Sequence, residues 1–224
     1  MYPWVTHTHS HLGGKCRHKC KYCYVQAMAK QFPNMRARYS GDMHLIEKEF
    51  DVKYGSGKTI FIEHMNDIAC ALDAEIDRIF KHIAEWPDNN YVFQTKDPFH
   101  FMWHSNRLSP NDILGTTIET NLVFEDIMNN APSPSNRRIG MMLWAKERPE
   151  VTRFVTIEPI LDFDIDLLVP MIVDIDPSFV NIGADSKGTG LPEPSAQKVR
   201  DLIESLNKHG IEIKQKKNLD RIFK

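Results

Sequence analysis

The sequence has few cysteines and no long apolar segment. No apolar run approaches the roughly 20 residues that a membrane-spanning helix needs, and no fixed repeat or low-complexity tract is present. The formal net charge is −2, so a general positive field that would favour nucleic acid is also absent. These absences argue against membrane, repeat and disordered classes. They leave an ordinary globular composition, with 42% apolar and 26% charged residues, which we interpret as one domain covering residues 1–224.

The N-terminus lacks the pattern of a signal peptide, so we expect a cytoplasmic protein without a membrane partner. Thiols stay reduced in the cytoplasm, and disulfides are rare there. The four cysteines of the chain are therefore expected to be free thiols.

Three of those cysteines, Cys16, Cys20 and Cys23, lie within eight residues in the spacing C-x3-C-x2-C. A four-iron cluster held by three thiolates keeps one iron without a protein ligand, and that iron can bind a substrate or cofactor. A zinc site is the alternative, with His18 as the fourth ligand. Structural zinc sites, however, usually join two separated ligand pairs, and the chain contains no second cysteine pair.

This spacing, with Tyr22 just before the last cysteine, resembles the radical S-adenosylmethionine (SAM) superfamily. The resemblance implies a [4Fe-4S] cluster on Cys16, Cys20 and Cys23, with SAM bound to the open iron. It also implies reductive cleavage of SAM to a 5'-deoxyadenosyl radical, which takes a hydrogen atom from the substrate. Tyr22 would then lie near the adenine of SAM.

Short apolar runs alternate with amphipathic stretches along the chain, which predicts parallel βαβ units. Six or seven such units indicate an α/β fold, a partial (β/α)6 barrel like the radical SAM core. The cluster loop would span residues 13–24, and a short strand and tail would span about 211–224. The predicted strands are 4–6, 59–63, 90–95, 112–119, 154–158, 179–183 and 211–214. The predicted helices are 24–31, 67–86, 99–105, 135–148 capped by Ser135, 165–175 interrupted at Pro170, and 195–208.

Polar residues follow the predicted strands, where the active sites of parallel barrels lie. Many radical SAM proteins carry a Gly-Gly-Glu-like motif after the second strand that receives the SAM amino group. Residues 63–67 take its place here, and an oxygen of Asn66 or Asp67 would suit the ammonium group.

Two further strand ends have a role under the same resemblance. Thr117 and Glu119 are placed to hydrogen-bond the SAM ribose, since carboxylates commonly bind ribose hydroxyls. Lys96 would bind the SAM carboxylate or an anionic substrate, although a surface lysine at a strand end is an equally good interpretation.

Four segments of the chain extend the resemblance to short radical SAM proteins of bacteriophages and prophages, which are similar in layout to spore photoproduct lyase. This resemblance implies a nucleobase or nucleotide substrate, with rearrangement of an amino-acid-modified thymine in phage DNA as the best hypothesis. A repair lyase or a peptide-modifying enzyme is the alternative. The segments are 93–96, 115–119, 154–159 and 181–184.

Other function classes stay open at this point. The alternating His7, His9 and His11 are typical of metal-dependent hydrolases, which would need further ligands such as His64 and Asp185. A non-enzymatic iron–sulfur or zinc-binding module is a second alternative. An enzyme of the radical SAM type would need an electron donor such as flavodoxin or ferredoxin, and the basic residues of the cluster loop would suit an anionic partner.

The fourth cysteine, Cys70, lies on the apolar side of a predicted helix. We therefore expect it to be a core residue rather than a ligand.

Overall fold

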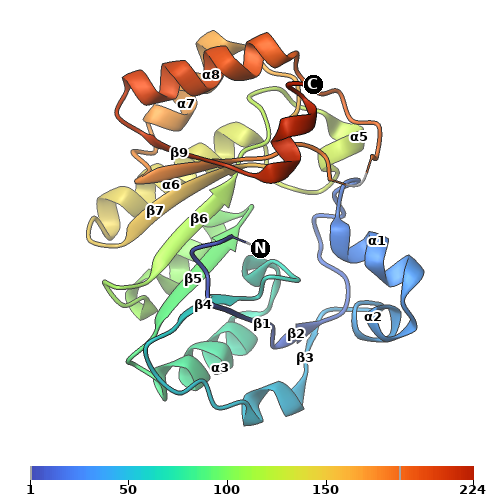
Figure 1. Cartoon of the computed structure of the whole chain (residues 1–224). Helices are drawn as coiled ribbons and strands as arrows, with labels where there is room; N and C mark the ends of the chain where they lie inside the picture. The colour runs from blue at the N-terminus through green and yellow to red at the C-terminus, as the bar shows by residue number, and fades with distance from the viewer. Residues whose placement is uncertain (1, 187) are drawn as a thin grey trace.

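The computed structural model describes residues 2–186 and 188–224, and its central feature is a parallel seven-stranded sheet (Figure 1). The strand order is β1-β4-β5-β6-β7-β8-β9, so each strand pairs with the next one along the chain. This arrangement confirms the predicted α/β partial barrel. The strands are β1 (His7–His9), β4 (Thr59–Ile62), β5 (Asn90–Thr95), β6 (Ile113–Thr117), β7 (Thr152–Ile157), β8 (Phe179–Ile182) and β9 (Glu212–Gln215).

Helices connect the strands, as parallel pairing requires. The long connecting helices are α3 (Asp73–Ala84), α6 (Pro134–Glu147), α7 (Ile165–Val173) and α8 (Ala196–Lys208). The shorter helices are α1 (Tyr24–Gln31), α2 (Pro33–Arg38), α4 (Pro98–Phe101), α5 (Glu125–Met128), and the 3-10 turns η1 (Glu47–Asp51), η2 (Ile68–Cys70), η3 (Met102–Arg107) and η4 (Lys217–Arg221). A two-stranded antiparallel ribbon, β2 (Leu12–Gly13) with β3 (His44–Leu45), lies beside the sheet.

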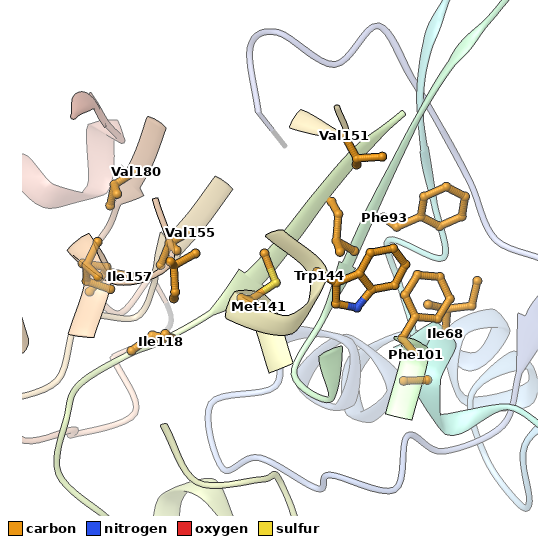
Figure 2. Packing of buried hydrophobic residues seen from close by; sticks show 14 of the residues in the cluster. Ile68, Phe93, Phe101, Ile118, Met141, Trp144, Val151, Val155, Ile157 and Val180 are labelled. Atoms are coloured by element: carbon orange, nitrogen blue, oxygen red, sulfur yellow. The ribbon is translucent and has the colours of Figure 1, made fainter. Parts of the chain in front are cut away.

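The outer face of the sheet packs against the helices and forms the main apolar core. Trp144 of α6 is 1% exposed and stacks on Phe101, with ring centroids 5.7 Å apart. Figure 2 shows Trp144 among Phe93, Phe101 and Ile68. The indole N–H of Trp144 donates a hydrogen bond to the carbonyl of Pro98 at 2.8 Å, so its polar atom is satisfied inside the core.

The inner face of the sheet has a separate aromatic cluster because side chains alternate along each strand. Phe154 of β7 and Phe179 of β8 stack with centroids 5.3 Å apart, and Tyr2 and Trp4 from the N-terminal segment pack on them. Gly115 of β6 is required here, since a β-carbon would lie 2.2 Å from the Phe154 ring.

One predicted helix, 24–31, and one predicted strand, 90–95, match the observed bounds. The predicted first strand, 4–6, is wrong, because Trp4 packs into the inner cluster and the pairing with β4 begins at His7. The predicted helix 67–86 is divided into η2 and α3, since the chain is extended at Leu72.

The other helix details also differ from the predictions. The cap of α6 is Ser133 rather than Ser135, and its hydroxyl accepts the Asn136 N–H. Helix α7 continues through Pro170 without the expected break. Within the described part of the chain, no helix combines the length and apolarity needed to cross a bilayer.

Candidate functional site

The cluster loop lies at the carboxyl ends of the strands, where it is fixed by α5. The backbone N–H of Lys21 donates to the Ile127 carbonyl at 2.9 Å, and Asn130 donates to the His18 carbonyl at 3.0 Å. The side chain of Asn130 also donates to the Arg17 carbonyl. Because α5 follows β6, these bonds place the loop over the edge of the sheet where parallel barrels carry out their chemistry.

All four cysteines are free thiols, as predicted. The Cys20 thiol is buried and donates to the Met128 carbonyl, with 3.9 Å between sulfur and oxygen. Burial raises the pKa values of Cys20 and Cys23, and the nearby Lys96 ammonium opposes this rise. Both thiols are thus neutral by themselves, and they would ionise on binding a metal.

Cys16 turns away from these two thiols and contacts Cys70. The two sulfur atoms lie 3.8 Å apart, and the Cys70 sulfur lies 3.5 Å from His18 Nε2. Cys70 is buried as predicted, yet it also belongs to this cluster, which sequence reasoning missed. The hydrogen bond from Cys16, followed by that from His18, lowers the pKa of Cys70 to about 5, although burial opposes both.

Asp67 lies at the start of η2 and fixes this end of the loop. Its carboxylate accepts hydrogen bonds from His18 Nε2 at 2.9 Å and from the backbone N–H of Lys96 at 2.7 Å. It also accepts from the Thr95 hydroxyl at 2.6 Å and from the Ala69 N–H at 3.1 Å. Burial disfavours the charged form, but the charge and hydrogen bond of His18 outweigh it and lower the pKa of Asp67 to about 2.

Glu119 is the centre of a buried ionic cluster at the other end of the loop. Arg137 of α6, which is 0% exposed, lies 2.5 Å from Glu119 Oε2, and Lys96 Nζ lies 2.5 Å from Oε1. The Tyr22 hydroxyl donates to the same Oε1. Burial raises the pKa of Glu119 against the effect of Arg137, and burial lowers the pKa of Lys96 to about 8.

One donor in this cluster has no partner. Arg137 Nη2 is buried and makes no hydrogen bond within the described residues. Its other nitrogens donate to the carbonyls of Pro132 and Thr117 and to Glu119. A buried guanidinium N–H without a partner costs free energy, so this position suits an anionic or carbonyl group of a ligand.

The structure brings together some of the predicted SAM residues and separates others. Tyr22, Lys96 and Glu119 contact one another directly, and Lys96 Nζ lies 5.2 Å from the centre of the Tyr22 ring. Asn66 reaches the cluster loop, where its amide donates to the Gly14 carbonyl at 3.4 Å. Thr117 instead faces the inner side of the sheet, and its hydroxyl accepts from Gln94 at 2.8 Å.

Sequence reasoning missed Arg137, although a signal was present. Arg137 lies four and seven residues before Met141 and Trp144, so it shares their stripe on α6, and all three are buried. An arginine on the apolar stripe of a helix indicates a buried acidic partner, here Glu119.

The three alternating histidines lie on the helix-covered side of the sheet. His7 and His9 pair with Ile60 and Ile62 of β4, which belong to the main apolar core. His11 is buried between Glu63 and His82, at 2.8 Å from each, and His9 contacts the Glu49 carbonyl. Among the described residues, the potential metal ligands that lie within 4.8 Å of one another are Cys16, His18 and Cys70. None of the three alternating histidines belongs to this group. Glu63 also accepts the N–H groups of His11 and Leu12, so this histidine holds the segment that leads into the cluster loop.

Comparison with known proteins supports the fold. No protein-family model and no curated protein matches the sequence. A solved structure of a spore photoproduct lyase variant, with bound AdoMet and a dinucleoside spore photoproduct, has a TM-score of 0.62 at 12% identity, over 95% of this chain and 77% of that one.

SuiB from Streptococcus suis has a similar fold. Its structure with the precursor peptide SuiA has a TM-score of 0.61 at 9% identity, over 98% of this chain and 51% of that one. A SuiB structure with S-adenosylmethionine has a TM-score of 0.59 at 9% identity. The chain therefore spans about half of SuiB, and its fold is similar to those of SuiB and spore photoproduct lyase.

Proposed function

We propose that the chain is a radical SAM enzyme that binds a [4Fe-4S] cluster through Cys16, Cys20 and Cys23. The main support is that three free thiols of one short loop lie at the carboxyl edge of a parallel sheet, beside a buried ionic cluster. When bound, such a cluster supplies the electron that cleaves SAM and so starts hydrogen abstraction from the substrate.

The residues present fit this cofactor by their chemistry. Iron–sulfur clusters are held by cysteine thiolates, and none of these three cysteines is tied up in a disulfide. The cations of Lys96, Arg137 and His18 lie close enough to favour the ionised form of Cys20. Cys16 would exchange its contact with Cys70 for the cluster, since one thiolate cannot serve both.

The ionic cluster around Glu119 would hold SAM. Lys96 and the unpartnered Arg137 Nη2 suit its carboxylate, because both are buried donors. Tyr22 stands beside them and would contact the adenine. Glu119 and Thr117 would bind the ribose, Glu119 after exchanging one of its present partners.

The SAM amino group needs an oxygen acceptor near the loop. Asn66 would provide it. Its amide nitrogen already donates to the Gly14 carbonyl of the loop, which leaves the amide oxygen to accept from the amino group. Asp67 would contribute its negative charge, while its present hydrogen bonds keep Lys96 and His18 in place.

For the substrate we propose a nucleobase, with rearrangement of an amino-acid-modified thymine in phage DNA as the specific hypothesis. The inner face of the sheet has amide and hydroxyl groups of the kind that pair with base edges, on Gln94, Thr156 and Asn181. These groups now bond to Tyr2, Thr117 and one another, so a base would have to replace those partners. The dinucleoside in the spore photoproduct lyase structure points the same way. The peptide bound by SuiB makes a peptide the second candidate.

The electron donor would be an acidic protein such as flavodoxin or ferredoxin. The first 41 residues contain no aspartate or glutamate, and Lys15, Arg17, Lys19, Lys21 and Lys30 are all exposed. Such a face attracts an acidic partner and raises its association rate.

Anaerobic reconstitution with iron and sulfide tests the proposal. We expect about four iron and four sulfide per chain, and 5'-deoxyadenosine after addition of dithionite and SAM. Cys20→Ala is the matched control and should lose the cluster and the product together. Wild-type protein that holds iron and sulfide but never forms 5'-deoxyadenosine would refute the enzymatic proposal.

The substrate class needs a second experiment. Reconstituted enzyme would be offered a DNA oligonucleotide with an aminoacyl-modified thymine, the unmodified oligonucleotide, or a peptide, each deuterated at exchange-stable carbon positions. Deuterium in 5'-deoxyadenosine identifies the compound that loses a hydrogen atom. Deuterium from the modified oligonucleotide alone supports the thymine hypothesis, and deuterium from the peptide alone rejects it.

A further inference from the structure

Cys16, His18 and Cys70 gather at one end of the cluster loop, although Cys16 and Cys70 are 54 residues apart in the chain. Their ligand atoms lie within 4.8 Å of one another. We propose that these three residues form a metal site of their own, which takes a divalent ion with tetrahedral sulfur and nitrogen ligands, in the first instance zinc. The site goes beyond the proposed function because it uses Cys70, which the three-cysteine motif does not contain.

The distances agree with a tetrahedral ion. With zinc–sulfur bonds of about 2.3 Å and zinc–nitrogen bonds of about 2.0 Å, tetrahedral angles place two sulfurs about 3.8 Å apart and sulfur and nitrogen about 3.5 Å apart. The observed Cys16–Cys70 and Cys70–His18 distances are 3.8 Å and 3.5 Å. A disulfide would need about 2.05 Å between the sulfurs, so the pair is not one.

The site is built before any metal arrives. His18 and Cys70 are 5% and 6% exposed, so the ligands are screened from competing water. Arg17 Nη2 donates to the Ala69 carbonyl at 2.8 Å, which ties the loop to η2 beside Cys70. Asp67 accepts the Ala69 N–H and so fixes η2 from its other side. Ligands held this way lose little conformational entropy on binding.

Metal binding would replace the hydrogen bonds among these three side chains and the bond from His18 to Asp67. His18 Nε2 faces both Cys70 and the Asp67 carboxylate, so an ion at Nε2 would replace the bond to Asp67. Imidazole then binds as the neutral ring and the two cysteines as thiolates, so the His18 Nε2 proton and the protons held by the thiols leave to solvent. Three protein ligands leave a fourth position, which water can fill. Because Cys16 belongs to this site and to the cluster site, zinc and the cluster exclude each other on one chain.

Zinc titration of the full-length, reduced, metal-free protein tests the site. A chromophoric chelator would compete for the ion, and cobalt would report a tetrahedral thiolate site by its absorbance. We expect about one zinc per chain. Cys70→Ser and His18→Ala should each weaken zinc binding at least about tenfold, as even outer-sphere changes commonly do. Cys23→Ser is the matched control and should bind zinc as the wild type does.

Two results would overturn the site. The first is that Cys70→Ser still binds zinc with wild-type affinity. The second is that Cys23→Ser weakens zinc binding as much as Cys70→Ser does, which would place the ion on the three-cysteine motif. Circular dichroism would verify that each variant folds. If Cys70→Ser does not fold, cobalt bound to the wild type decides, because its sulfur-to-cobalt absorption distinguishes two thiolates from three. Failure of SAM cleavage would leave these results unchanged, so the two proposals fail separately.

Discussion

The two ends of the cluster loop fall within eight residues of sequence but contact different neighbours. The Cys16–His18 end contacts Cys70 and Asp67, which both come from the segment after β4. The Cys20–Cys23 end lies by a buried ionic cluster, in which Tyr22 meets Lys96 from the end of β5 and Glu119 from the end of β6.

This difference separates two kinds of chemistry on one loop. The first end already gathers two sulfurs and a nitrogen within 4.8 Å of one another, and the Cys16–Cys70 and Cys70–His18 distances suit a tetrahedral ion such as zinc. Among the described residues, no group of three or more His, Cys, Asp or Glu ligands gathers around the thiols of the second end, and the nearby cations suit an anionic cofactor. Cys16 is the residue that the two ends share, so its partner decides which chemistry the loop supports.

The largest expected effect lies at the ionic end. Arg137→Met leaves Glu119 buried without its main counter-charge, and breaking a buried ion pair in this way costs about 3–5 kcal/mol. The change should lower the free energy of unfolding by that amount in a urea titration.

The neighbouring Arg138→Met is the control. Arg138 pairs with Asp174 on the partly exposed side of α6, where ion pairs contribute about 0–1 kcal/mol. Equal losses in the two variants would contradict the view that the ionic end depends on Glu119 and Arg137.

A smaller effect is expected at the thiol end. Asp67→Asn weakens the acceptor for His18, Thr95 and the Lys96 N–H, and a hydrogen bond to a buried charge contributes about 1.5–3 kcal/mol. We expect a loss of about 2–3 kcal/mol in unfolding free energy. Asp77→Asn, whose partner Arg107 is partly exposed, should cost less than about 1 kcal/mol. A loss no larger than that of Asp77→Asn would show that Asp67 does not organise this end.

A pH dependence is expected at Lys96. Burial lowers its pKa from 10.5 in the unfolded chain to about 8 in the folded one. Between these values the unfolded state binds more protons, so the stability of the wild type rises with pH. The unfolding free energy of Lys96→Met, relative to that of the wild type, should therefore fall from pH 8 to 10.5. The exposed Lys208→Met should show no such trend, and a constant difference between Lys96→Met and the wild type would contradict the shifted pKa.

The sequence predicts most of the fold because its signals are local. The apolar run 90–95 and the segment 24–31 have the predicted bounds, since periodicity and flanking residues determine them. The first strand was misplaced because apolar character alone does not distinguish a strand from a segment that packs over the sheet. Trp4 and Val5 pack across the inner face of the sheet. The ribbon of β2 and β3 was missed, since its strands have only two residues each.

The site was predicted in part, because only some of its residues have local signals in the sequence. Tyr22, Lys96 and Glu119 follow from the motif and the strand ends, and the structure brings them into contact. Arg137 was missed because its partner is distant in the chain. Cys70 was predicted to be a core residue. The sequence separation between Cys16 and Cys70 gives no indication that their thiols are in contact.

The central claim is that Cys16 serves both ends of the loop, and competition between metals tests it most directly. Wild type and Cys70→Ser would be reconstituted with iron and sulfide, each with and without one equivalent of zinc, and the bound iron would then be measured. The account predicts that zinc lowers the iron content of the wild type and leaves that of Cys70→Ser unchanged. Equal suppression in both proteins, or none in the wild type, would contradict it.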